Sequence, residues 1–465
     1  MTLPQDSLLT TLSALLMTGY FPGIVSMIRE RGTPTMQAIG THDTLANYGS
    51  NIFRYEVGMS DSARFGAHIQ RDFGSPRTGR AASLDYYYDP DEQNPQTQDF
   101  RGVDVVAHIS NADLEQTRNA TEMYNLAQRI TKNAFNTLNE APSYLIHSDK
   151  TGRLGTVSAK LDFDSAAYDG ASSYTSGATT AWIQVGEHSI GAYKRDMVLE
   201  TRNTSGALTA SEIKVIRVDP INDAIAVQIT DKSAAAGTSN LNSIAATDII
   251  YRAGEYNAGF PCAINEICKT DYSGDSSSNW MRKDRLAADN AIFLPEALYR
   301  SGASSKEVEI EDLDELGNAY EAVWSKDNHD PLKLIGGLRL IQTLRRNADE
   351  NAIRVVTVTD SNGERRTGKS RYVHTHPHLG DIEIEGDPTA RDDRLILMPR
   401  DSIKMMYAGM KGMKVFTNQH GIFDRIDGVN ASGGGSKNFK LEASAVMTPV
   451  VKDFSQFGAA FNLTA

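Results

Sequence analysis

The sequence predicts an α+β fold in which an extended hairpin, a long helix and a separate small β domain follow one another along the chain. The first observation is residues 110–140, the longest helical pattern, which lacks Pro and Gly and repeats apolar residues at helical spacing. The second is a series of short strand-like runs between residues 197 and 252. The third is the mixed helix and strand patterning that runs from residue 259 onward.

Composition indicates an ordinary globular protein. The 465 residues are 40% hydrophobic and 23% charged, enough for about two to three domains. No apolar run approaches the roughly 18 residues of a membrane-spanning helix, and the first residues lack the pattern of a secretory signal, so we expect a cytoplasmic protein. Cys262 and Cys268 are too few for a disulfide framework and are predicted to be buried or semi-buried thiols. The net charge of −12 argues against a surface that coats nucleic acid, although an acidic lining facing packaged DNA is compatible with it.

The front of the chain has little core of its own. Leucines at positions 8, 12, 15 and 16 predict a short helix, whereas residues 31–60 show no steady period and predict an arm that is stabilised by neighbouring chains. Residues 81–89 and 100–109 are strand-like and predict the two arms of a long hairpin. The long helix follows directly, with Ser110 as its N-cap and Pro142 ending it.

Later elements follow from local patterns. A small-residue tract at 165–181 predicts a loop, and strands are predicted at 197–201, 212–218, 224–230 and 248–252. We expect helices at 311–325 and 331–347, and strands at 353–358, 381–385, 394–398 and 439–451.

Two motifs have the form of chemical sites. Residues 363–370, GERRTGKS, match a phosphate-binding loop, but no helix pattern begins at Ser370 to point its N-terminus at an anion. His374, His376 and His378 alternate as ligands of one metal would, and HTHP resembles the core of the JAMM metalloproteases. That family also needs a Ser and an Asp at short fixed spacing, which this chain lacks. We therefore assign no catalytic, cofactor-binding or metal-binding residue.

The order of these elements resembles the major capsid proteins of tailed bacteriophages, with the Hong Kong 97-like fold. Two stretches carry the resemblance. One runs from Asp248 through Gly254 and residues 263–267 to Tyr272, Asp275 and Trp280. The other comprises Asp387-Pro388, residues 381–384 and 395–398, and Pro449.

The resemblance implies a structural protein without an active site or cofactor. It implies self-assembly as hexamers and pentamers into an icosahedral shell, formed in the host cytoplasm and found in the virion. That shell would enclose double-stranded DNA without reading its sequence, with portal, scaffolding and decoration proteins as partners and no membrane. The implied parts are an N-terminal arm (1–60), an extended hairpin loop (61–109), a spine helix (110–150), an inserted β domain (151–258), a peripheral return (259–330), an axial domain (331–430) and a closing peripheral strand (431–465). The alternatives are a nucleotide-dependent or metal-dependent enzyme and another virion structural protein, such as a tail protein.

Overall fold

The fold is that of a computed structural model of the chain. It describes residues 33–41, 52–59, 81–87, 99–109, 129, 141–164, 168, 170, 173–186, 190–229, 240–275, 280–300, 305–323, 332–347, 353–359, 365–407, 414–415, 423–429 and 435–464. The helix predicted at residues 8–16 lies outside these ranges. Of the long helix predicted at 110–140, only Arg129 is described, and it is helical.

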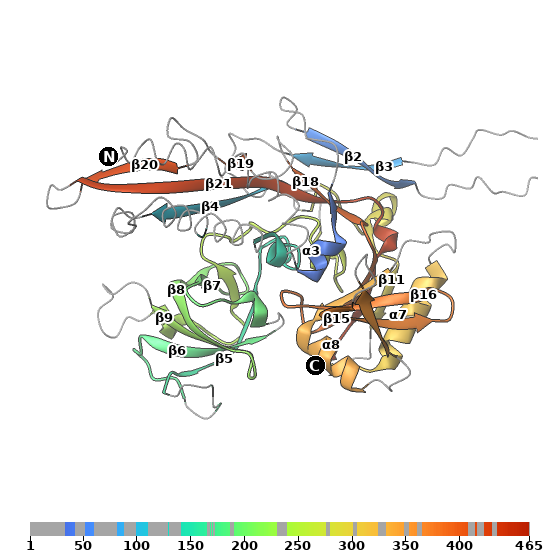
Figure 1. Cartoon of the computed structure of the whole chain (residues 1–465), viewed down its shortest axis with the longest axis horizontal. Helices are drawn as coiled ribbons and strands as arrows, with labels where there is room; N and C mark the ends of the chain where they lie inside the picture. The colour runs from blue at the N-terminus through green and yellow to red at the C-terminus, as the bar shows by residue number, and fades with distance from the viewer. Residues whose placement is uncertain are drawn as a thin grey trace, which may run out of the picture.

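A seven-stranded sheet with two helices forms one part of the molecule (Figure 1). Helices α7 (Ile310–Val323) and α8 (Leu338–Asn347) belong to it. Its strand order is β11-β22-β17-β13-β16-β15-β14. The strands are β11 (Ala297–Arg300), β13 (Leu332–Gly337), β14 (Ile353–Thr359), β15 (Arg365–His376), β16 (Gly380–Asp387), β17 (Arg394–Pro399) and β22 (Gly458–Phe461). Two short strands that follow β11 and β22 in the chain, β12 (Lys306–Glu307) and β23 (Leu463–Thr464), pair with each other in parallel.

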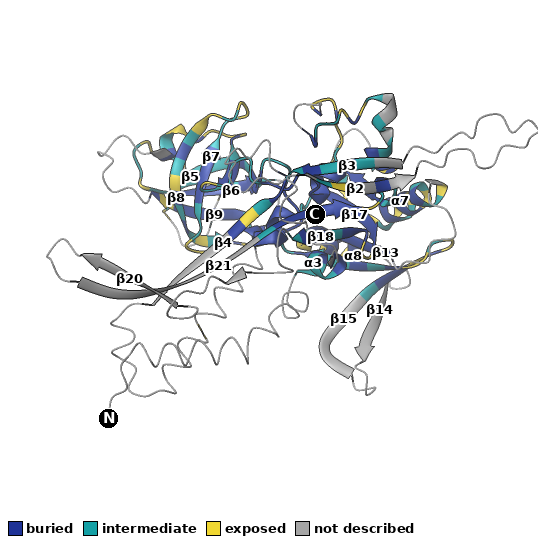
Figure 2. Cartoon of the chain, turned by 90° about the horizontal axis from the view of Figure 1, so that it is seen from above, coloured by how far each residue is buried: buried dark blue, intermediate teal, exposed yellow. Residues whose placement is uncertain are grey.

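Both faces of this sheet are buried at its central strands β13 and β17, where successive side chains point to opposite faces. Leu395 and Leu397 of β17 join the core under the two helices, whereas Ile396 and Met398 join the larger core of the rest of the chain. Figure 2 shows buried strands here and in the barrel described below. The sheet is therefore a middle layer between two cores.

Strand β13 corrects the helix predicted at 331–347, of which only the second half is helical. An unbroken apolar run such as LKLIGG fits a fully buried strand as well as a helix. β13 pairs with β16 on one side and β17 on the other, and all six residues are buried. At the end of β13, a Cβ on Gly337 would collide with the Asp392 carboxylate, so any other residue there would require Asp392 to move.

A second sheet is built on β21 (Gly435–Val451), a strand of 17 residues that runs along one side of the molecule (Figure 1). One edge of β21 pairs with β4 (Arg101–Ile109). The other edge pairs in turn with β18 (Ile403–Tyr407), β19 (Lys414–Val415) and β20 (Phe423–Val429).

The hairpin predicted from residues 81–89 and 100–109 is wrong in its pairing. Strand β3 (Ala81–Tyr87) pairs instead with β2 (Ile52–Met59), in a two-stranded sheet of its own, and β4 pairs with β21. Both β3 and β4 are true strands, but alternation alone does not identify a strand's partner. The hairpin therefore starts inside the segment predicted to be an arm.

Part of the predicted arm also packs against its own chain. Helix α3 (Pro34–Ala38) buries Thr35 and Ala38, and β1 (Gly40–Thr41) pairs in parallel with β18. The Asp401 N–H donates a hydrogen bond to the Ala38 carbonyl over 2.9 Å. Residues 33–41 are thus a strap across the body, because short buried backbone segments must satisfy their hydrogen bonds locally.

Residues 155–252, within the β domain predicted at 151–258, form a closed six-stranded barrel in the order β10-β5-β6-β9-β8-β7. Two strands that were not predicted, β5 (Gly155–Asp162) and β6 (Thr180–Gly186), flank the small-residue tract. The remaining strands are β7 (Val198–Arg202), β8 (Leu208–Asp219), β9 (Ala224–Ile229) and β10 (Ile249–Arg252). Phe163, just before the tract, and Tyr168 within it pack against the ring of Trp182.

The barrel joins the body through two adjacent segments, 149–154 and 252–260, which we call the neck. The Asn257 N–H donates to the Thr151 carbonyl over 2.8 Å. A Cβ on Gly259 would lie 1.9 Å from the Asp149 carbonyl oxygen, so only glycine permits this approach of the two segments. Helical residues 141–145 lead into the neck, and the Ile146 N–H donates to the Pro142 carbonyl, so helical structure does not stop at Pro142 as predicted.

We expect Gly259→Ala to lower the free energy of unfolding by about 3 kcal/mol, because backbone atoms must move to admit the methyl group. Urea unfolding measures this change. Gly102→Ala is the control, since a Cβ at Gly102 meets nothing within 4 Å. Equal stabilities of the two variants would contradict the close approach.

Candidate functional site: a charged hub beneath the hairpin

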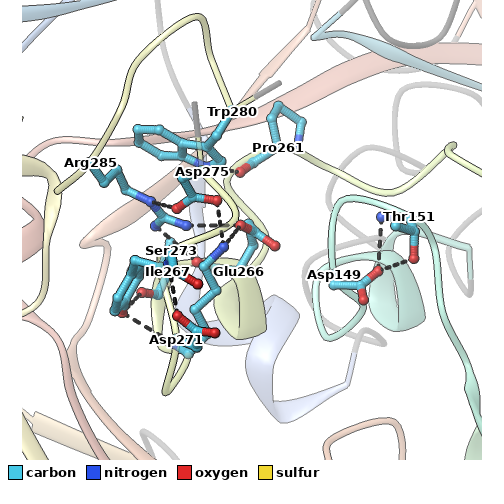
Figure 3. A network of polar contacts seen from close by, with 12 residues as sticks. Asp149, Thr151, Pro261, Glu266, Ile267, Asp271, Ser273, Asp275, Trp280 and Arg285 are labelled. Atoms are coloured by element: carbon cyan, nitrogen blue, oxygen red, sulfur yellow. Dashed lines mark hydrogen bonds and ion pairs between the residues drawn. The ribbon is translucent and has the colours of Figure 1, made fainter. Parts of the chain in front are cut away.

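A buried arginine organises the segment between the neck and the seven-stranded sheet (Figure 3). Arg285 is 0% exposed. Its Nη2 lies 2.8 Å from Oε1 of Glu266, and its Nε lies 2.5 Å from Oδ2 of Asp275. The guanidinium also lies over the rings of Trp280 and Tyr272, at 4.0 and 4.5 Å from their centroids. A buried arginine needs such partners, because an unpaired charge is costly away from water.

A second cation balances the two carboxylates. Lys269 Nζ lies 2.7 Å from Glu266 Oε1 and 2.6 Å from Asp275 Oδ1. Burial raises the pKa of Glu266, and the charges of Lys269 and Arg285 oppose this shift. Two positive and two negative groups therefore meet in one network. We call Glu266, Lys269, Asp275 and Arg285 the hub.

The hub segment also holds the root of the β2–β3 hairpin. The Tyr86 hydroxyl of β3 lies 3.6 Å from Sγ of Cys262, and both side chains are buried. Burial raises the pKa of Cys262 to about 12, so this thiol is held neutral rather than poised as a nucleophile. Cys268 is likewise a buried free thiol, which confirms the prediction for both cysteines.

A second buried polar cluster, which we call the joint, connects the strap to the body and comprises Thr35, His147, Asp387 and Thr389. Asp387 Oδ2 accepts from the Thr35 N–H over 3.1 Å and lies 3.5 Å from Nε2 of His147. The N–H and hydroxyl of Thr389 donate to Oδ1 of Asp387 over 2.8 and 2.6 Å. Burial alone would raise the pKa of Asp387, but His147 and the hydrogen bonds from Thr35 and Thr389 outweigh it and hold the pKa well below its usual range. The joint therefore contains an ionised buried carboxylate.

The three histidines of the candidate metal motif each contact helix α7, and the His378 N–H also donates to Nδ1 of His376 over 3.4 Å. Gly317 of α7 permits this packing, because a Cβ there would lie 2.7 Å from the ring of His376. The partners are spaced along one face of α7: Asp314 at 2.9 Å from His374, Asn318 at 3.3 Å from His376, and Glu321 at 3.5 Å from His378. In the described part of the chain, no three His, Cys, Asp or Glu side chains are grouped to hold a metal ion.

The phosphate-loop motif is extended backbone where the structure describes it. Arg365 to Ser370 lie within strand β15, which continues to His376 and pairs with β14 and β16. No helix starts at Ser370, so the backbone lacks the helix N-terminus that binds phosphate in such loops. Gly363 lies outside the described residues.

Sequence reasoning quoted Asp275 and Trp280 only for a resemblance, and it missed Arg285 altogether. The available signal was the mixture of charged and aromatic residues within 266–285. The joint at His147 and Asp387 carried no local signal, since its partners lie far apart in the chain.

No protein-family model matches the sequence, and no curated protein matches it. The solved structures similar to the chain include phage capsids and an encapsulin. The Cyanophage A-1(L) capsid is 10% identical with a TM-score of 0.41, over 93% of this chain and 93% of that chain. A chain of the satellite phage P4 procapsid is 9% identical with a TM-score of 0.34, over 96% of this chain and all of that chain (100%). The SrpI encapsulin of Synechococcus elongatus is 15% identical with a TM-score of 0.24, over 38% of this chain and 55% of that chain. At TM-scores this low, we base the function on the chain's own architecture.

We expect Arg285→Met to lower the free energy of unfolding by about 3–5 kcal/mol, because Glu266 and Asp275 would lose a buried partner. Urea unfolding measures the loss, and Glu266→Gln in the same chain should restore part of it. Arg54→Met is the matched control, since Arg54 pairs with Asp85 but its side chain is 69% exposed. A loss no larger than that of the control would contradict a stabilising hub.

The depressed pKa of Asp387 predicts an acid-sensitive joint. Its contribution to stability is present above the ordinary carboxyl pKa of about 4 and is lost as the pH falls from there toward the folded-state pKa. We expect Asp387→Asn to lower stability at neutral pH and to flatten the decline below about pH 4. Unfolding curves at several pH values test this, with exposed Asp164→Asn as control. An unchanged pH profile in Asp387→Asn would refute it.

Proposed function

We propose that the chain is a capsid shell protein that assembles with its own copies, as hexamers and pentamers, into an icosahedral shell enclosing phage genomic DNA. The observation that carries the proposal is the β2–β3 hairpin. It forms a two-stranded sheet of its own, and the Tyr86 hydroxyl at its root lies 3.6 Å from Sγ of Cys262, in the segment that also carries the hub. Isolated two-stranded hairpins are marginally stable, so a hairpin that a chain anchors this firmly is suited to packing on a neighbouring copy.

The β21 sheet supports the same proposal. Seventeen residues at about 3.3 Å each give β21 a length of roughly 55 Å. It spans one side of the molecule past both the barrel and the seven-stranded sheet (Figure 1). A long strand that is paired on both edges is a rigid element. Such an element suits a subunit that packs side by side with copies of itself in a shell.

The enzyme alternatives have less support. The histidines are paired with α7 and the GKS residues lie in strand β15. No helix in the described part of the chain is long and apolar enough to cross a membrane. The net charge of −12 is compatible with a shell that encloses DNA without binding its phosphates tightly. Portal, scaffolding and decoration proteins would complete the virion in this proposal, with assembly in the host cytoplasm.

Size-exclusion chromatography and negative-stain microscopy of the expressed full chain test the proposal, with shells, hexamers or pentamers as the expected result. A stable monomer at all protein concentrations, with and without a co-expressed scaffolding protein, would sink it. ATP turnover is the discriminating control. A shell protein has none, so Lys369→Ala changes nothing, whereas activity that this variant abolishes would favour the nucleotide-dependent enzyme.

A further inference from the structure

The turn that precedes Arg285 has an unusual backbone. The Lys283 N–H donates to the Trp280 carbonyl over 2.7 Å and closes a four-residue turn. Its two central residues, Met281 and Arg282, have φ of 42° and 56°. This is the pattern of a type I′ turn, which favours Asn, Asp and Gly because other side chains crowd their own backbone at positive φ. Neither residue is of those types, so this backbone is strained.

Burial accounts for the residue at the first position. Met281 is 3% exposed and belongs to the main core, which offsets the strain of its backbone. Arg282 is different, because its side chain is 32% exposed and turns toward the hairpin. Its contacts therefore identify what the strained turn accomplishes.

Arg282 meets the hairpin root at three points. Its Nη2 donates to the Asp85 carbonyl over 2.8 Å and to the carboxylate of Asp99. Its guanidinium lies 3.8 Å from the centroid of the Tyr87 ring. Asp99 is itself tied to Tyr87, because the Tyr87 N–H donates to its Oδ2 over 2.8 Å and the Asp99 N–H donates to the Tyr87 carbonyl over 3.0 Å. Arg282 thus spans the end of β3 and the start of the segment that leads to β4.

Burial raises the pKa of Asp99, and Arg282 is the strongest opposing charge, followed by the Tyr87 N–H. The ion pair between Arg282 and Asp99 therefore offsets the cost of burying the Asp99 carboxylate. The guanidinium that offsets the burial of this carboxylate is carried by a residue with φ of 56°, in the strained turn.

We propose that the turn Trp280–Lys283, which we call the latch, sets the direction of the β2–β3 hairpin through the contacts of Arg282. When the turn relaxes to negative φ, Arg282 loses its contacts with the hairpin, and the hairpin changes direction about its root. The hub, the seven-stranded sheet and the β21 sheet stay folded during this change. The inference concerns the hairpin's attachment to its own chain and does not depend on the proposed shell function.

Hydrogen exchange of the full chain tests the latch. Arg282→Asn removes the guanidinium but keeps a residue that tolerates positive φ, so the turn itself is preserved. We expect amides of 52–59 and 81–87 to exchange about tenfold or more faster in this variant, because a charge-assisted contact is lost. Amides of β13 and β17 should be unchanged. Arg54→Asn is the matched control, since it removes an exposed arginine from the same hairpin and should change exchange about twofold at most.

Two outcomes would overturn the latch. One is Arg282→Asn exchange at 52–59 and 81–87 equal to that of the control variant. The other is equal acceleration in β13 and β17, which would mean that Arg282 supports global stability instead of the hairpin alone. In the unaltered chain, the latch also requires the hairpin to open at urea concentrations too low to open β13 and β17, and simultaneous opening would reject it.

Discussion

The structure depends on the ion pairs of Arg285 with Glu266 and Asp275 at a site closed to water. Such pairs give little net stability relative to apolar packing, but they tolerate little displacement, because any separation leaves a buried charge unpaired. Lys269 completes the balance from the partly exposed side. In the described residues of this segment, 261–275 and 280–285, α6 (Ile264–Ile267) is the one helix or strand, so this network, with Trp280 donating to the Pro261 carbonyl, defines their arrangement.

The hub and the Asp387 joint are connected through adjacent backbone segments. The Ile264 N–H of α6 donates to the Ile146 carbonyl over 2.8 Å, one residue before His147. His147 in turn touches Thr35 of the strap over 2.7 Å. Hub contacts join residues within about twenty positions, whereas Thr35 and Asp387 are 352 positions apart. The hub can therefore form early from local chain, and the joint closes only when distant segments have collapsed, since long loops are slow to close.

Local patterns predicted what depends on local sequence. Helix α7 and strands β14, β17 and β21 lie close to the predicted ranges, because period and burial determine them. Pairing was not predictable in this way. The partner of β4 lies more than 300 residues away in β21, and β3 turned back to β2 rather than forward. For the site, alternation correctly placed His374 and His376 on one strand, but their partners are on α7, which no spacing within the motif reveals. Arg285 is marked in the sequence only by the mixed charged and aromatic text 266–285 around it, because its distinguishing property is its burial, which depends on the fold.

The attachment of the hairpin follows from geometry. Eight residues of β2 at about 3.3 Å each make an arm of roughly 26 Å, so a tilt of about 10° at the root moves the tip by about 4 Å. That displacement is as large as the distance of about 4 Å within which two side chains are in contact, so it would break contacts made at the tip. A single contact at the root would leave such a tilt free. Tyr86 against Cys262 and Arg282 against Tyr87 hold the same strand at adjacent residues, whose side chains point to opposite faces. Two contacts on opposite faces of β3 restrain the tilt more than one contact would, and one of the two is made by Arg282 of the strained turn.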